Sequence, residues 1–337
     1  MTELALAVYA SETGAHLVRP PPDRGWSAHL RRFDAHAYKQ DLAARGLRFL
    51  GRSAPAFPAL LRAVHDPPPG LFVRGAAEAE LLSRPAVSVV GARACSGYGA
   101  SVARSLAREL ARAGLLVVSG MARGIDAEAH RGALDAGRPT VAVLGCGIDR
   151  DYPAAHAELA SRIAGTGLLV SEYAPGVEPA PWRFPARNRI VAGLAAATVV
   201  VEARERSGAL ITADLALEEG REVFAVPGEI TSALSAGTNA LLKLGASPLT
   251  AAADVLTCFG VEAAGTEWLD LGREAARLLA LLRDAPAAAD ELTRRSGLGA
   301  DAVARALVEL ELAGAARAHD GLYRVQAEFR QGLTPSD

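Results

Sequence analysis

Six short runs of aliphatic and β-branched residues recur through the middle of the chain, and each leads into a turn. The runs lie at 86–90, 115–118, 140–144, 167–171, 197–201 and 222–226. They are continuous rather than alternating, which is typical of strands buried on both faces of a parallel sheet. Helical segments fall between them, at 100–113, 127–136, 154–164, a helix that ends near 193, and 209–219. The pattern predicts an α/β fold, an extended Rossmann-like doubly wound parallel sheet, whose carboxyl edge binds ligands.

The region before this sheet is harder to interpret. Residues 28–44 have a helical pattern, and proline clusters at 20–22 and 67–69 interrupt the rest. We expect a small helical (SAM-like) domain and an extended linker over 1–75. It lacks the Gly-x-Gly hairpin of paired-helix modules that bind the DNA backbone. A structural or dimerising role and DNA contact therefore both stay open.

The region after the sheet predicts a separate winged-helix domain. Helical patterns at 273–283, 288–295 and 301–313 precede a β-ribbon around Asp320 and Gly321. Between residues 267 and 330 there are eleven acidic residues against nine arginines. Because an acidic recognition helix reads DNA poorly, we expect protein contact or packing there. The predicted domains are 1–75, 80–260 for the Rossmann-like domain, and 267–330.

Three glycine-rich turns, at 91–99, 119–126 and 145–149, follow the first three strands. Glycine lets the backbone approach a ligand, and a helix that begins at such a turn adds a partial positive charge. Arg93 and Arg123 add guanidinium groups suited to phosphate, and Ser96 and Ser119 add hydroxyl groups. The turns therefore predict a phosphate-binding edge without identifying the phosphate.

Composition limits the partners and the compartment. The formal net charge is −2, so a nucleic-acid site has to be local. The three cysteines are far apart in the sequence, which fits a reducing compartment and predicts no metal site. The first residues lack the basic region of a signal peptide, and no apolar run is long enough to span a membrane. We expect a cytoplasmic protein without a membrane segment.

A strip of basic and aromatic residues follows the proline-rich loop at 172–185. Trp182 and Phe184 lie among Arg183, Arg187 and Arg189. Single-stranded nucleic acid needs this combination, because bases stack on rings while arginine follows the backbone. The two rings also fit an alternative in which they pack the loop onto the core, and the strip alone leaves both open.

Two enzyme classes share this kind of fold. A nicotinamide dehydrogenase is excluded, because the first turn lacks the Gly-x-Gly-x-x-Gly spacing and the second strand does not end in an acidic residue. A nucleotide-binding or nucleotide-cleaving enzyme on a related Rossmann-like fold is the remaining alternative. Its Pro-Gly-Gly-x-Gly-Thr turn is missing from the loop at 202–208.

Five ordered motifs carry a resemblance to a known family. They are GARACSGYG at 91–99, SGMARGID at 119–126, FPARNRI at 184–190, SGALITA at 207–213, and VPG at 226–228 with GTN at 237–239. Over about residues 80–250 the chain resembles the DNA-processing family DprA, also called Smf. The resemblance implies a homodimer without cofactor or catalytic residues that binds and protects incoming single-stranded DNA and loads the RecA recombinase on it in natural transformation.

The resemblance and the turns together assign a nucleic-acid site and an interface. The nucleic-acid residues are Gly91, Arg93, Ser96, Gly97, Ser119, Gly120, Arg123, Gly124, Phe184, Arg187, Asn188, Arg189, Arg206, Ser207 and Gly208. The segment 239–244 is apolar nearly all round, and the resemblance places the dimer and RecA contacts near it. The interface residues are Asn239, Leu241, Leu242 and Leu244. The alternative is that this segment only covers the last strand.

Overall fold

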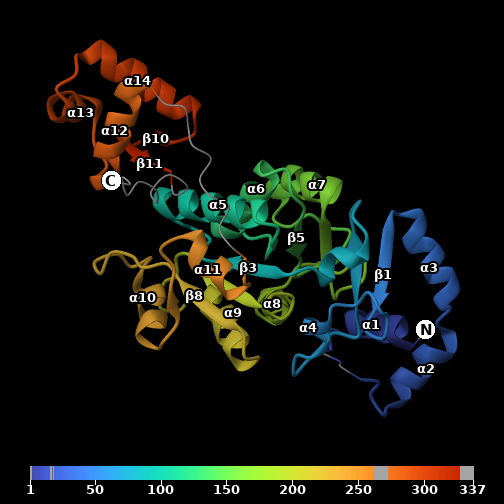
Figure 1. Cartoon of the computed structure of the whole chain (residues 1–337). Helices are drawn as coiled ribbons and strands as arrows, with labels where there is room; N and C mark the ends of the chain where they lie inside the picture. Colours follow the sequence, from blue (N-terminus) through green and yellow to red (C-terminus); the bar gives the residue numbers. More distant parts are fainter. Residues whose placement is uncertain (1, 16, 18, 262–271, 327–337) are drawn as a thin grey trace. The chain divides into compact units, whose positions relative to one another are not determined.

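The computed structural model describes residues 2–15, 17, 19–261 and 272–326. Contacts within the chain divide it into two units, residues 1–262 and residues 263–337. The first unit is built on a nine-stranded sheet (Figure 1), and the second contains a two-stranded one. None of the helices in the described ranges combines the length and the apolar composition needed to cross a membrane.

The large sheet is parallel over most of its width. Across the sheet the strands follow in the order β1 (Leu47–Gly51), β2 (Gly70–Arg74), β6 (Leu168–Ser171), β5 (Thr140–Val143), β4 (Leu116–Ser119), β3 (Ala86–Val90), β7 (Ala197–Val200), β8 (Glu222–Ala225) and β9 (Ser247–Pro248). The strands from β6 to β9 are parallel, and β2 and β1 add an antiparallel edge. All six predicted strands are confirmed to within one residue at each end.

The direction of winding reverses at β3. From β3 the chain moves outward through β4, β5 and β6, and it then crosses back so that β7 pairs with the other side of β3. Loops that leave neighbouring strands at such a reversal separate and open a crevice at the carboxyl edge of the sheet. The loops after β3 and β7 therefore flank the place where this fold binds ligands.

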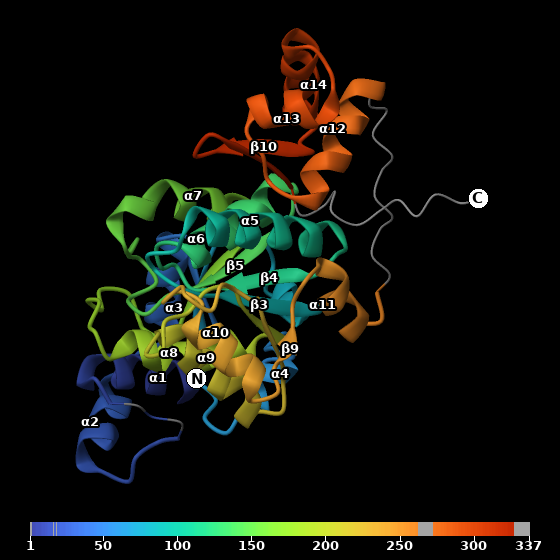
Figure 2. The same cartoon turned by 90° about the vertical axis from the view of Figure 1, so that its left-hand side faces the viewer.

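Helices cover both faces of the large sheet. On one face α5 (Gly97–Arg112), α6 (Ile125–Asp135) and α11 (Ala252–Cys258) bury apolar side chains against Val87 and Val89 of β3. On the other face α4 (Ala59–Arg62), α8 (Arg183–Gly193), α9 (Gly208–Glu218) and α10 (Ala236–Lys243) pack around Ala86 and Val90. Figure 2 shows α5, α6 and α7 (Ala157–Thr166) on one side of the strands and α8 and α9 on the other. Two short 3-10 helices, η1 (Ala79–Ser83) and η2 (Ala154–His156), complete the connections.

The first 75 residues contain more regular structure than the sequence predicted. They form α1 (Thr2–Thr13), α2 (Arg24–Arg32) and α3 (Ala35–Ala44) before β1 and β2. The predicted helix at 28–44 is two helices, because Asp34 adopts an extended conformation and accepts hydrogen bonds from the backbone of His36 and Ala37. The prediction of an extended linker was wrong for β1 and β2, which pair with each other and join the large sheet.

The smaller unit has the predicted winged-helix elements. They are α12 (Arg273–Asp284), α13 (Ala289–Ser296), α14 (Ala300–Leu312), β10 (Ala316–His319) and β11 (Leu322–Val325). Leucines from all three helices form its core, including Leu278, Leu292 and Leu307. Asp320 and Gly321 both have positive φ, as a tight turn between antiparallel strands requires.

Candidate nucleic-acid interface

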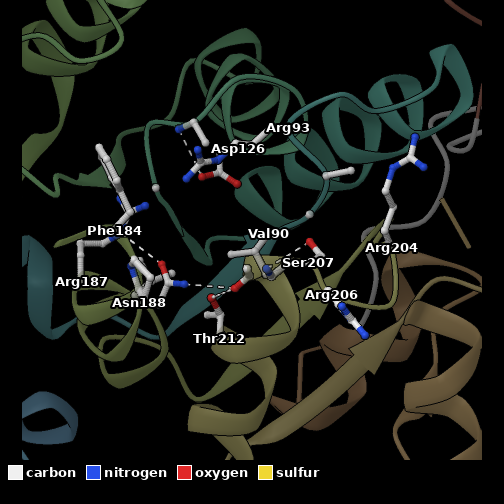
Figure 3. Close-up of a pocket in the computed structure, with 18 of the residues that line it drawn as sticks. Val90, Arg93, Asp126, Phe184, Arg187, Asn188, Arg204, Arg206, Ser207 and Thr212 are labelled. Atoms are coloured by element: carbon white, nitrogen blue, oxygen red, sulfur yellow. Dashed lines mark hydrogen bonds between the residues drawn. The ribbon is translucent and has the colours of Figure 1, made fainter. Parts of the chain in front are cut away.

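A cavity of about 350 Å³ opens at the reversal between β3 and β7. Its walls come from the turn after β3, the turn after β4, the first part of α8, and the loop that leads from β7 into α9 (Figure 3). Nine of the fifteen predicted nucleic-acid residues line it: Gly91, Arg93, Gly120, Phe184, Arg187, Asn188, Arg206, Ser207 and Gly208. Segments far apart in the chain thus meet where the strand order places them.

Three arginine side chains give the rim its charge. Arg93, Arg204 and Arg206 line the cavity and are exposed, and no ion pair involves them within the described residues. Sequence reasoning left Arg204 out of the site, although it lies in the same loop as Arg206. Its place in the loop after a parallel strand would have been enough to include Arg204 in the predicted site.

A buried charged pair of residues lies at the floor. Arg187 is 5% exposed and donates a hydrogen bond to the backbone oxygen of Val143. Asp126 accepts a bond from the backbone of Ala122 at 3.3 Å. Burial raises the pKa of Asp126, and the nearby charge of Arg187 opposes that rise. Burial lowers the pKa of Arg187, and the nearby charge of Asp126 opposes that fall. A Cβ atom at Gly120 would clash with the Asp126 carboxylate and lie 2.6 Å from Arg187 Nη2, so any larger residue there would force this buried pair to shift.

The first turn of α9 forms another wall. Ser207 is the N-cap residue and accepts a hydrogen bond from the backbone of Ala209 at 3.3 Å. The side chain of Asn188 donates to the backbone oxygen of Gly208 at 3.1 Å, which ties α8 to this turn. The partial positive charge of the helix terminus therefore adds to that of the arginines.

The N-terminus of α5, the predicted phosphate position, already holds an anion from this chain. The carboxylate of Glu202, 5% exposed, accepts a bond from the Ser96 backbone at 2.9 Å and another from the Ser96 hydroxyl. Neither Ser96 nor Gly97 lines the cavity. The structure thus places the open cationic surface beside α9 and the Arg93 side chain, away from the α5 terminus.

Four other predicted residues also lie outside this cavity, for identifiable reasons. The Ser119 hydroxyl donates to the backbone oxygen of Val89 at 2.6 Å, within the sheet. Gly124, at φ 75°, packs against the backbone of Arg93. Arg189 is paired with Glu172 at 2.6 Å and with Asp66 at 3.1 Å. Arg123 is exposed on the turn after β4.

Phe184 is the aromatic surface of the cavity. Its ring is half-buried and lies under the Arg93 guanidinium, whose central carbon is 5.5 Å from the ring centroid. Gly145 supports the ring from behind, since a Cβ atom there would be 2.8 Å from Phe184 Cδ1. Trp182, by contrast, is 48% exposed and does not line the cavity. Only one of the two predicted rings therefore belongs to this site.

The predicted interface residues have different environments. Leu241 is 5% exposed and belongs to the core, and Leu242 is partly buried against the same core. Asn239 exchanges hydrogen bonds with the backbone of Gly228. Leu244, at the end of α10, is 84% exposed. Within the described residues no group of His, Cys, Asp and Glu side chains is placed to hold a metal ion.

Comparisons with known proteins identify the family. A family model described as DNA recombination-mediator protein A matches residues 48–260. The chain belongs to this family. A second model, described as the DprA winged helix domain, matches residues 262–321. The resemblance in the five motifs is thereby confirmed.

Individual relatives agree with the family models. The chain is 47% identical to a putative DNA processing protein DprA of Mycobacterium tuberculosis, over 76% of this chain and 68% of that protein. The X-ray structure of DNA processing protein A from Streptococcus pneumoniae has a TM-score of 0.65 and 36% identity, covering 76% of this chain and 93% of that one. A structure of DNA processing protein A from Helicobacter pylori, reported for its single-stranded DNA binding mode, has a TM-score of 0.55 and 32% identity. The match covers 60% of this chain and 92% of that one.

Proposed function

We propose that this protein binds single-stranded DNA in the cavity between β3 and β7. The proposal is carried by three arginines that meet one aromatic ring, Phe184, at that edge. They are Arg93, Arg204 and Arg206, and none of them forms an ion pair within the described part of the chain. Arginine neutralises phosphates, and a base stacks on the ring whatever its sequence. The single-stranded DNA binding mode described for the Helicobacter pylori relative supports the same ligand.

The dimensions of the cavity favour a single strand over a duplex. A space of about 350 Å³ with a buried floor suits one nucleotide-sized group. A base stacked inside a duplex has to leave its neighbours before it can enter such a space, and that step costs energy. A single strand offers its bases without this cost.

A nucleotide-cleaving enzyme is disfavoured by the same geometry. Nucleotide-binding folds of this kind hold a ligand phosphate at the N-terminus of the helix that follows the first strand. Here the Glu202 carboxylate accepts hydrogen bonds from Ser96 at that terminus and would repel a phosphate. We therefore propose a binding protein without a catalytic residue.

A titration separates these functions. The purified protein is mixed with labelled single-stranded DNA, with the corresponding duplex, and with mononucleotides. We expect tight binding of the single strand, weaker binding of the duplex, and no turnover of the nucleotides. Equal affinity for duplex and single strand, or release of a base or phosphate from a nucleotide, would refute the proposed function.

We further propose that the protein protects incoming strands and loads RecA on them as a homodimer, as the family resemblance implies. The exposed end of α10 is a suitable contact, because Leu244 is 84% exposed and Ile230, in the loop before α10, is 96% exposed. Leu241 is 5% exposed, so we leave it out of the proposed contact.

Light scattering tests the dimer. Leu244→Arg should give a folded monomer that binds long single strands more weakly than the wild type and short ones almost equally, because linked sites raise the effective concentration only on long strands. Leu30→Arg, at a leucine that is 44% exposed in α2, is the matched control. A dimer that persists in Leu244→Arg would show that α10 is not the interface.

A further inference from the structure

A second hollow of about 320 Å³ adjoins the first cavity at Phe184. It shares Arg93, Phe184 and Arg187 with the first cavity, and its remaining wall includes Arg123, Tyr152 and Pro153. No pattern in the sequence singles out Tyr152, which belongs to none of the five family motifs. Arg123 belongs to the predicted site but not to the first cavity, so this hollow also accounts for its position.

The hollow presents an aromatic surface to solvent. Tyr152 is 44% exposed, and its ring is stacked on Phe184 with centroids 5.3 Å apart and an angle of 26° between the planes. Two stacked rings fix each other in place, so little side-chain freedom is left to be lost when a third ring stacks on them. Gly145 holds Phe184 from behind, and the aromatic pair is therefore supported before any ligand arrives.

The hollow also has its own cation. Arg123 is exposed, and the described part of the chain contains no ion pair that involves it. Arg93 reaches both spaces, since it lines each of them and lies over the Phe184 ring. The chemistry of the hollow is therefore that of the first cavity: an aromatic face flanked by guanidinium groups.

We propose that this hollow is a second nucleotide subsite, in which the base stacks on Tyr152 and Arg123 contacts its phosphate. The inference rests on the proposed function, because the ligand of both spaces is one single strand. The two spaces share a wall, so they take nucleotides that are close neighbours on that strand, and the strand crosses above Arg93 and Phe184. Binding therefore needs at least two ordered nucleotides on each protomer.

Substitutions at Tyr152 test the subsite with a matched control. Tyr152→Leu removes the ring and keeps an apolar side chain, whereas Tyr152→Phe keeps the ring. Trp182→Leu is the control, because Trp182 is similarly exposed, at 48%, and lines neither space. Thermal melting of each variant shows that it folds. Affinities are measured with short oligodeoxythymidines, and a fluorescent base analogue at successive positions reports stacking on a ring.

The expected result is specific to Tyr152. Loss of one stacked base corresponds to binding about 5- to 150-fold weaker for Tyr152→Leu. Tyr152→Phe and Trp182→Leu should bind like the wild type. In the wild type two adjacent positions of the fluorescent base should be quenched on binding, and in Tyr152→Leu one of them should lose its quenching.

The outcomes distinguish this inference from the proposed function. Unchanged binding by Tyr152→Leu, together with weaker binding by Arg206→Ala, would overturn the second subsite and leave the first cavity as the DNA site. Equal losses of affinity in Tyr152→Leu and Trp182→Leu would also overturn the second subsite. They would show that any exposed ring contributes to binding, whether or not it lines the hollow. Failure of the wild type to bind single strands would refute the proposed function itself.

Discussion

The salt dependence of DNA binding should show whether the arginines in the loop between β7 and α9 contact phosphates. Arg204 and Arg206 are exposed there and line the first cavity, so each is free to neutralise one phosphate. Each contact to a single strand contributes a slope of about −0.7 to the logarithm of affinity against the logarithm of salt concentration. The double variant Arg204→Ala/Arg206→Ala should therefore have a slope that is about 1.4 smaller in magnitude than that of the wild type.

This difference is large enough to measure. Between about 50 and 200 mM salt the wild type should lose about sevenfold more affinity than the double variant. Fluorescence anisotropy with an oligodeoxythymidine of about six nucleotides keeps the measurement to one site. Arg24→Ala/Arg138→Ala removes the same charge from two exposed arginines outside both spaces and is the control. Parallel salt plots for the wild type and the Arg204/Arg206 variant would refute the assignment of these arginines to DNA.

Three further outcomes follow from individual side chains. Phe184→Ala should weaken single-strand binding by about 1–3 kcal/mol with little change in melting temperature, and a large drop in melting temperature would show that the ring is part of the core. Gly120→Ala should destabilise the fold by about 1–3 kcal/mol, because its methyl group meets the side chains of Asp126 and Arg187. Gly208→Ala, with open space around it, should melt like the wild type. Burial lowers the pKa of His130 to about 4, below that of the unfolded chain, so stability should fall as the pH drops below about 6.5, by about 2 kcal/mol at pH 5. Melting curves at pH 7 and pH 5 should show a smaller change in His130→Asn, and an equal change would refute that cause.

The parallel strands could be predicted because their signal is local. Every residue of β3 is buried, so its sequence is a continuous apolar run. The edge strand β1 carries Arg48, whose guanidinium donates to the backbone oxygens of Gly75 and Ala77. Such a strand has no continuous apolar run, and β2 follows a proline cluster that suggested a linker. Both strands depend on pairing with distant segments, which no local pattern records.

The part of the candidate site that depends only on strand order could be predicted from the sequence. Glycine turns after parallel strands must meet at one edge, and nine of the predicted residues do line one cavity. The exceptions depend on partners that lie far away in the sequence. Ser96 binds a glutamate 106 positions later, and Arg189 pairs with Asp66, 123 positions earlier. A single sequence contains no information about which arginine is already neutralised.

The carboxylate that accepts hydrogen bonds from Ser96 should determine how the protein responds to free nucleotides in a cell. In folds of this kind the helix after the first strand offers its terminus to free nucleotides, which are abundant wherever DNA is handled. In this protein Glu202 occupies that terminus through the backbone and hydroxyl of Ser96. We expect ATP in large excess to leave its affinity for a DNA strand unchanged at constant ionic strength. If ATP has no effect, the Glu202 carboxylate is a built-in anion that keeps free nucleotides from competing with the DNA strand.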